Sequence, residues 1–227
     1  MTRSQGRGPA RGVVLAWPER DRLCGQMLGH VPGAAPVLTD GVVTLRAHEP
    51  DDADPIMEQC NDPDSRRFTP VPRPYGWAEA QDFLDQASSG WREMSPTSNR
   101  FWAISVPGPD GELAFAGSID YTASGMGTAE VGYGLHPAFR GHGFSARALM
   151  LVLDHAFADG IEVMHWRAVV GNWASRKTAW RCGFRVEGTV RGLCPQPDGP
   201  PQDGWIGSLR RGDARQPCEP WPGGLAG

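Results

Sequence analysis

The chain contains 227 residues, with 22 Lys and Arg, 26 Asp and Glu, and a formal net charge of -4 at pH 7. Its length suits one domain of ordinary size plus an extension. The slight negative charge argues against nucleic acid as a partner, because binding to its backbone draws on clustered Lys and Arg. Apolar runs stay shorter than the roughly twenty residues of a membrane span. We therefore expect a soluble, cytoplasmic protein with no membrane partner.

The cysteines and histidines indicate no metal. The six histidines are isolated, and the cysteines have neither paired metal-ligand spacing nor the density of a disulfide scaffold. We expect free thiols in a reducing compartment and predict no metal site. The five cysteines are Cys24, Cys60, Cys182, Cys194 and Cys218.

Composition divides the chain into three parts. Residues 1–36 are rich in Gly, Pro and Arg with little periodicity, which predicts a flexible N-terminal arm. Residues 212–227 end in a Pro and Gly cluster and are expected to form a flexible C-terminal tail. The folded domain then covers residues 37–211.

The first half of this domain predicts a strand, two helices and a meander of three strands. Asp51 and Asp52 favour a helix start, because acidic side chains are stabilising in the first turn. A Pro-rich segment at residues 61–76 predicts an irregular connection between the helices. The expected elements are a strand at 42–46, helices at 51–60 and 77–94, and strands at 101–106, 113–121 and 128–135.

The second half alternates helices and strands. Residues 146–157 repeat apolar side chains at helical spacing over most of their surface, which predicts a largely buried helix. The order of elements indicates an α+β fold with a mixed sheet. The remaining elements are a strand at 164–170, a short helix at 173–182, and strands at 184–191 and 205–210 joined by a Pro-rich connection.

A glycine-spaced hexamer links the strand at 128–135 to the buried helix. Glycine removes the β-carbon that would block a ligand, and a helix N-terminus presents unpaired N–H groups with a partial positive charge. Such a place suits a phosphate, although a plain loop is the simpler interpretation of two glycines alone. The hexamer consists of Arg140, Gly141, His142, Gly143, Phe144 and Ser145.

The hexamer resembles the Arg/Gln-x-x-Gly-x-Gly/Ala signature of the GNAT superfamily of acetyltransferases. Arg140 and Gly143 match the signature, and Ser145 stands where the family has Gly or Ala. The resemblance implies a GNAT-like fold, with a mostly antiparallel central sheet splayed in the middle and flanked by helices. It also implies that the hexamer and the preceding Leu135 bind acetyl-CoA, which is the acetyl donor and a co-substrate.

A second segment has the pattern of a capped helix. Asn172 is a good N-cap, and Gly183 followed by Phe184 is typical of a helix C-terminus. The spacing of this segment also resembles the GNAT branch of ribosomal-protein N-terminal acetyltransferases related to RimJ and RimL. By that resemblance Asn172 and Ser175 contact the pantetheine arm. In another branch a Tyr protonates the leaving thiolate, and here that position is Ala179. The resemblance therefore implies that the hydroxyl of Ser175 is the acid.

The strand at 128–135 has one face that is nearly bare. This face carries Glu130 and then only Gly132 and Gly134, because side chains alternate along a strand. Glycine inside a strand marks a bulge or the close approach of another group, so a ligand can lie here; a surface Glu on a twisted strand is the alternative. In related GNAT enzymes a carboxylate at this place helps deprotonate the acceptor amine through water. The resemblance therefore implies Glu130 as the catalytic base.

Aromatic residues cluster near the segments that wall the acceptor site in GNAT proteins. These segments correspond here to residues 61–76 and 192–204. Most aromatic residues serve as core or loop anchors, yet four of them are candidates for acceptor contacts. They are Tyr75, Trp77, Trp102 and Trp205.

The leading hypothesis is direct transfer of acetyl from acetyl-CoA to a primary amine. A protein or peptide N-terminus is the favoured acceptor, because an α-amino group costs about 1 kcal/mol to deprotonate at pH 7 and Lys costs about 4–5 kcal/mol. Two alternatives stay open: an acetyltransferase that detoxifies a small amine or antibiotic, and a non-catalytic acyl-CoA binding module. The oligomeric state also stays open, a homodimer included.

Overall fold

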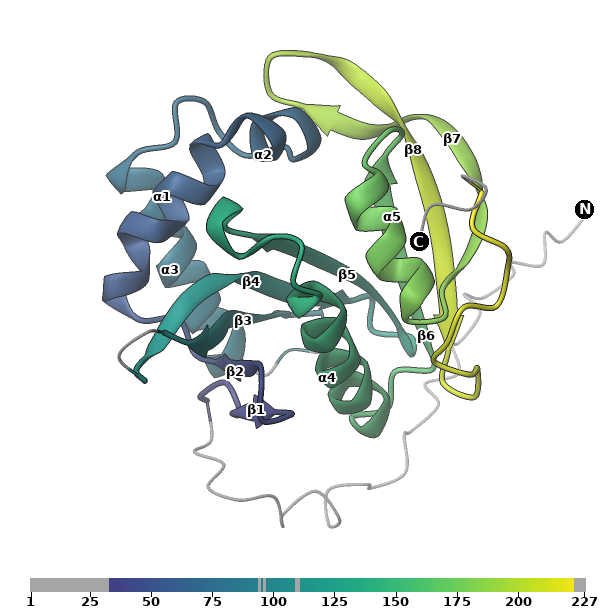
Figure 1. Cartoon of the computed structure of the whole chain (residues 1–227), viewed down its shortest axis with the longest axis horizontal. Coiled ribbons are helices and arrows are strands. Elements are labelled where there is room, and N and C mark those ends of the chain that lie inside the picture. Colours follow the sequence, from purple (N-terminus) through teal and green to yellow (C-terminus); the bar gives the residue numbers. More distant parts are fainter. Residues whose placement is uncertain (1–32, 94, 96, 109–110, 223–227) are drawn as a thin grey trace, which may run out of the picture. The chain divides into compact units, whose positions relative to one another are not determined.

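The structure, a computed structural model, describes residues 33–93, 95, 97–108 and 111–222 (Figure 1). In these residues eight strands form one sheet in the order β1-β2-β3-β4-β5-β6-β8-β7. Neighbouring strands are antiparallel except β5 and β6, which run parallel. The predicted α+β fold with a mixed, mostly antiparallel sheet is confirmed.

The helices and strands account for most of the described chain. The strands are β1 (Leu38–Thr39), β2 (Thr44–Arg46), β3 (Asn99–Pro107), β4 (Leu113–Ala123), β5 (Thr128–Leu135), β6 (Val163–Val169), β7 (Arg185–Gln196) and β8 (Gly199–Arg210). The α-helices are α1 (Ala53–Asn61), α2 (Pro63–Phe68), α3 (Trp77–Arg92), α4 (Phe144–Ala158) and α5 (Trp173–Arg181). Within the described ranges, none of these helices has the length and apolar character needed to cross a membrane.

The two faces of the sheet are covered by different helices. Trp102 and Ile104 of β3 belong to the larger core with α4, whereas Ala103 between them packs with Ile56 of α1. Because side chains alternate along a strand, α4 and α1 lie on opposite faces. In Figure 1, α1, α2 and α3 are grouped at the left, and α4 and α5 stand at the centre and right.

Strands β5 and β6 stay together for only part of their length. Their last paired residues are Val131 and Trp166. Beyond these, β5 continues to Leu135, paired with β4, and β6 continues to Val169, paired with β8. The sheet is therefore splayed in the middle, as the resemblance implied. We call the place where the two strands part the β5–β6 fork.

The first segment predicted as an irregular connection contains a short helix. Residues 61–76 include α2, and the side chain of Asp62 caps it by accepting hydrogen bonds from the N–H groups of Asp64 and Ser65, each at 3.1 Å. Pro63 occupies the first turn, where its missing N–H costs nothing. The prolines that suggested a loop thus include one that starts a helix.

The second such segment extends a hairpin. Residues 192–204, predicted as a connection, form the ends of β7 and β8 with a turn at residues 197–198. Strand β6 pairs with β8 only as far as Gly204. Pro200 and Pro201 therefore stand where β8 has no β6 partner, and their missing N–H groups break no bond to β6. The prediction of a connection at residues 192–204 was wrong, because the prolines that suggested it are tolerated where a strand has a free edge.

Residues after β8 fold back over α5. The indole Nε1 of Trp180 donates to the carbonyl oxygen of Glu219 at 2.7 Å, and the ring of Trp221 packs against those of Trp173 and Trp180. Residues 1–32 of the predicted arm and residues 223–227 of the predicted tail lie outside the described residues. The division into arm, domain and tail stays a prediction.

Candidate functional site

The N-terminus of α4 is open to an anion. Gly143, its N-cap, has a left-handed φ of 79°, and Gly141 has a φ of 86°. A β-carbon at either position meets no described atom within 4 Å, and the rings of His142 and Phe144 stack on each other beside it. No side chain caps α4, and within the described residues the N–H groups from Gly141 to Ser145 have no acceptor. These donors at the positive end of a helix dipole fit a phosphate.

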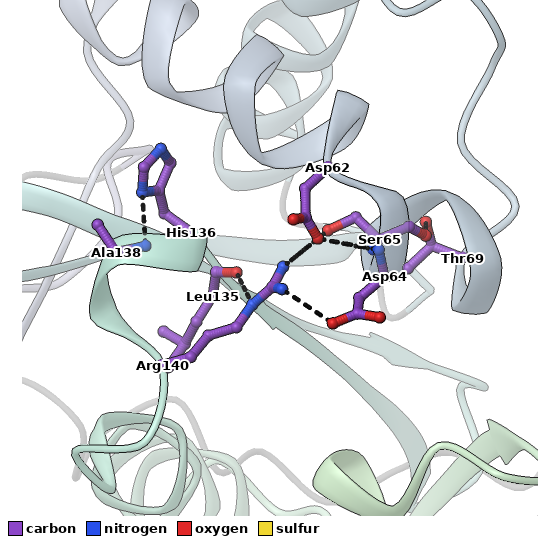
Figure 2. A network of polar contacts seen from close by, with 8 residues as sticks. All are labelled: Asp62, Asp64, Ser65, Thr69, Leu135, His136, Ala138 and Arg140. Atoms are coloured by element: carbon purple, nitrogen blue, oxygen red, sulfur yellow. Dashed lines mark hydrogen bonds and ion pairs between the residues drawn. The ribbon is translucent and has the colours of Figure 1, made fainter.

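The guanidinium of Arg140, at the start of the same loop, contacts α2 (Figure 2). Its Nη2 lies 2.7 Å from Oδ2 of Asp62 and 3.2 Å from Oγ of Ser65, and its Nη1 lies 3.4 Å from Oδ2 of Asp64. Its Nε donates to the carbonyl oxygen of Leu135 at 3.2 Å. Arg140 therefore joins the end of β5 to the N-terminus of α2, a contact that sequence reasoning did not anticipate.

The electrostatics of this contact favour the charged carboxylate. Partial burial acts to raise the pKa of Asp62, but the Arg140 guanidinium and the N–H groups capped by Asp62 outweigh burial and hold the pKa below its usual value. A second tie lies nearby, where Nε2 of His136 is 3.0 Å from Oε2 of Glu58 on α1. The segment that follows β5 is thus fastened to α1 and α2 at two points.

The predicted pantetheine residues lie at the N-terminus of α5. Oδ1 of Asn172 accepts from the N–H of Ser175 at 3.1 Å, which confirms the predicted N-cap. Oγ of Ser175 accepts from Nε1 of Trp166 at 3.0 Å and donates to the hydroxyl of Tyr133 at 3.3 Å. That hydroxyl donates to the carbonyl oxygen of Ser175 at 2.8 Å. Because Trp166 and Tyr133 belong to β6 and β5, Ser175 is held against both arms of the fork.

Glu130 lies on the opposite face of the sheet from Ser175. Its Oε1 forms an ion pair with Nε of Arg167 at 2.7 Å, and the two side chains are 39% and 49% exposed. Glu130 belongs to the paired part of β5, whereas Arg167 is the first residue of β6 beyond the last pair. Glu130, the predicted base, is therefore at the fork, where its carboxylate is already paired with the Arg167 guanidinium.

Asp120 of β4 lies beside the fork on the same face as Glu130. It pairs across the strands with Gly132, and a β-carbon added to Gly132 would lie 2.9 Å from Oδ1 of Asp120. In the described part of the chain, this carboxylate makes no hydrogen bond or ion pair. Burial, and after it the charge of Glu130, raises the pKa of Asp120 to about 7. A carboxylate with this pKa can accept a proton near neutral pH.

A family model decides what this site belongs to. The model for the acetyltransferase (GNAT) domain matches residues 43–185, which is more than half of the chain and includes the fork, the α4 loop and α5. The chain belongs to the GNAT acetyltransferase family. The resemblance found in the hexamer and in the Asn172 segment is confirmed, and the protein is an acetyltransferase.

Solved structures of other GNAT acetyltransferases share its fold. Mycobacterium smegmatis RimJ, in complex with CoA-disulfide, aligns with a TM-score of 0.64 and 21% identity, over 79% of this chain and 88% of RimJ. The microcin C7 self-immunity acetyltransferase MccE, in complex with acetyl-CoA and AMP, aligns with a TM-score of 0.65 and 20% identity, over 75% and 93%. RimL, a ribosomal L7/L12 alpha-N-protein acetyltransferase in its apo form, aligns with a TM-score of 0.66 and 17% identity, over 82% and 99%.

The four aromatic residues predicted as acceptor contacts are not brought together in this GNAT acetyltransferase. Trp102 is fully buried in the larger core with α4. Trp205 packs against Trp173 of α5, with ring centroids 4.8 Å apart. Tyr75 is buried in the smaller core with α1, and Trp77 is 57% exposed at the first residue of α3. Tyr75 therefore packs with α1 on the Asp120 face, Trp77 starts α3, and Trp102 and Trp205 belong to the opposite face.

Several polar residues of the site escaped sequence reasoning. One signal was available for Asp120, because a charged residue interrupts the apolar strand pattern of residues 113–121. For Arg167 and the carboxylates of α2 there was none, since their partners lie far away in the sequence. The residues missed are Asp62, Asp64, Asp120, Tyr133, Trp166 and Arg167.

Proposed function

We propose that this protein transfers the acetyl group of acetyl-CoA directly to a primary amine, and that its acceptor is the N-terminal α-amino group of a protein or peptide. One observation carries the proposal: the β5–β6 fork has hydroxyl groups on the α5 face and two carboxylates on the α1 face. A thioester bound on the α5 face would then reach an amine held by the carboxylates on the α1 face.

The α4 loop supports acetyl-CoA as the donor. The N–H groups from Gly141 to Ser145 have no acceptor within the described residues, and the positive φ values of Gly141 and Gly143 leave open space beside them. These N–H groups would hold the pyrophosphate, while the Arg140 guanidinium stays on α2. The unpaired edge of β5 up to Leu135 would offer backbone groups to the pantetheine arm. When bound, the thioester supplies an activated acetyl carbonyl.

The residues at the start of α5 would hold the reacting end of the donor. Oδ1 of Asn172 is used as a helix cap, and its Nδ2 makes no hydrogen bond within the described chain. The Ser175 hydroxyl points its proton to Tyr133, and rotation about one single bond redirects that proton to a neighbouring sulfur. Ser175 would then protonate the leaving thiolate, with Trp166 and Tyr133 keeping the side chain in place.

The chemistry of the acceptor side supports an α-amino acceptor. An amine attacks only in its neutral form, and an α-amino group loses its proton at pH 7 at a cost of about 1 kcal/mol, against about 4–5 kcal/mol for Lys. Carboxylates at the fork suit a terminal ammonium with its three N–H donors. The name of RimL, an alpha-N-protein acetyltransferase, fits this acceptor, but at 17% identity RimL adds only the shared fold.

A small amine is the second candidate acceptor. Nη1 of Arg73, after α2, lies 3.4 Å from Oδ2 of Asp198 in the turn of the β7–β8 hairpin. This ion pair joins the two segments that the sequence predicted as walls of the acceptor site, and the hairpin tip reaches toward α2 at the top of Figure 1. Joined walls favour a slender acceptor, which can be a chain terminus or a small molecule.

A thiol-release assay tests the proposed function. Acetyl-CoA would be offered with peptides of varied N-termini, the same peptides with a blocked N-terminus and a free Lys, and a panel of polyamines and aminoglycosides. The expected result is turnover with free N-termini and none with blocked peptides. Turnover confined to polyamines or aminoglycosides would favour the second candidate. Calorimetric binding of CoA without turnover of any amine would favour a binding module.

A further inference from the structure

Asp120 occupies the point on the α1 face where β5 leaves β6. Its strand partner is Gly132, the first residue of β5 beyond the last pair with β6. Because Gly132 has no side chain, the Asp120 carboxylate lies directly over the β5 backbone, with Oδ1 2.9 Å from where a β-carbon would be. A bulkier residue at position 132 would displace the carboxylate from the fork.

Among the described residues, the Asp120 carboxylate lacks the kind of partner that the Glu130 carboxylate has. Asp120 makes no hydrogen bond or ion pair in the described chain, whereas Glu130 is paired with Arg167 at 2.7 Å. Gln59 of α1 lies over the next position on this strand face, with Nε2 3.1 Å from where a β-carbon on Gly134 would be. Its Oε1 is buried and has no hydrogen-bond partner in the part of the chain that the structure describes. Two uncommitted acceptors along one bare strand face suit the N–H groups of an amine.

We propose that Asp120 removes the proton from the acceptor amine, directly or through one water molecule, and that Glu130 tunes Asp120 instead of acting as the base. This rests on the proposed function. The acceptor ammonium gives one proton to the Asp120 carboxylate, and its neutral nitrogen then bonds to the acetyl carbon. The carbon–sulfur bond breaks, Ser175 gives its hydroxyl proton to the sulfur, and the Ser175 oxygen takes the second proton that the nitrogen loses. The products are the amide and the thiol, and Asp120 returns its proton to solvent.

The surroundings of Asp120 set the pH at which it acts. Burial, with the charge of Glu130 added, raises its pKa to about 7. Titratable groups on neighbouring elements include Arg167 of β6, which is paired with Glu130, Arg100 of β3, His48 before α1, and Asp54, Glu58 and Cys60 of α1. Burial lowers the pKa of His48 to about 4, so His48 is neutral near pH 7. Since a base works only when deprotonated, the rate should rise with pH through about 7.

The test compares three full-length variants with the wild type. Asp120→Asn keeps the shape and removes the base, Glu130→Gln removes the charge that raises the Asp120 pKa, and Glu187→Gln is a matched control. Glu187 is a carboxylate on β7 of the same sheet that accepts a hydrogen bond from Ser208 at 2.6 Å. Thiol release with acetyl-CoA and the most reactive amine is followed from pH 5.5 to 9, and CoA binding is measured by calorimetry as a check on folding.

Each variant has a distinct expected result. Asp120→Asn should lower kcat about 10²-fold or more and remove the acidic limb of the pH profile, with CoA affinity unchanged. Glu130→Gln should keep the limb and move its midpoint to lower pH, and Glu187→Gln should change neither. A wild type with turnover, together with an Asp120→Asn variant that keeps its rate and limb, would overturn the role of Asp120 alone. A wild type that turns over no amine would overturn the proposed function, and this proposal with it.

A measurement on the unmodified protein guards against a misfolded variant. The side-chain carboxyl of Asp120 in ¹³C-aspartate-labelled wild type should titrate with a midpoint near 7. A midpoint below 5 would overturn the proposal, because the group would then be a weak base with no match to the expected limb.

Discussion

The proposed donor side and the proposed acceptor side of this enzyme are built in different ways. On the donor side, consecutive N–H groups from Gly141 to Ser145 come from one loop and the helix that follows it. On the proposed acceptor side, Asp120 comes from β4, Asp62 from the N-cap of α2 and Asp198 from the β7–β8 turn. One side is a short piece of backbone, and the other is an assembly of side chains from separate segments.

The difference shows which parts of a site can be predicted from the spacing of residues in the sequence. A backbone site needs glycine where φ is positive and a helix directly after it, so its spacing is regular. A side-chain site needs only that its residues meet in space, and no spacing records that meeting. Arg140 spans both sides, since it starts the donor loop and binds the α2 carboxylates.

Among the changes that test this comparison, the largest effect is expected from Gly143→Ala. An alanine in the left-handed conformation costs about 1–2 kcal/mol, and its methyl group lies in the open space beside the donor N–H groups. The dissociation constant of CoA, measured by calorimetry, should rise about tenfold or more. Gly160→Ala is the matched control, because Gly160 has a φ of 99° and equally open surroundings at the far end of α4. Equal CoA affinity in both variants would contradict a backbone phosphate site.

A smaller effect is expected from Asp62→Asn, which keeps a capping side chain on α2 and removes the charge that holds Arg140. If Arg140 positions α2, the acceptor KM should rise about threefold to fivefold, the equivalent of up to about 1 kcal/mol, with CoA affinity unchanged. Asp64→Asn is the control, because Asp64 lies farther from Arg140, at 3.4 Å, and is 72% exposed. Tighter CoA binding by Asp62→Asn would instead show that the freed guanidinium serves the phosphate.

The smallest effect is expected from Asp198→Asn, which breaks the ion pair between the hairpin turn and Arg73. Asp198 is 59% exposed and the pair is 3.4 Å long, so the acceptor KM should rise about twofold at most. Raising the ionic strength to about 1 M should make the acceptor KM of the wild type equal to that of the variant, because salt screens exposed ion pairs. A difference that persists at high salt would mean that Asp198 contacts the acceptor itself.

The sequence allowed a good prediction where local patterns carry the information. The strand at 128–135, the buried helix after it and the α5 cap all depend on residues within one element, and the structure has each of them. The prediction of irregular connections at residues 61–76 and 192–204 was wrong, because the first contains α2 and the second forms strand ends. Prolines tolerated at a helix start and at a strand edge resemble those of loops. The roles assigned to individual site residues stay predictions.

The sequence by itself determined the family, the α+β fold and the glycine-spaced loop before α4, because glycine spacing and side-chain periodicity act over a few residues. Only the tertiary structure decided that Arg140 binds α2, that Glu130 is paired with Arg167, and that Asp120 at the fork has no hydrogen-bond or ion-pair partner among the described residues. The physical reason is that the charge state of a carboxylate depends on its burial and its nearest ions. Both are set by strands and helices that are distant in the chain and adjacent in the fold.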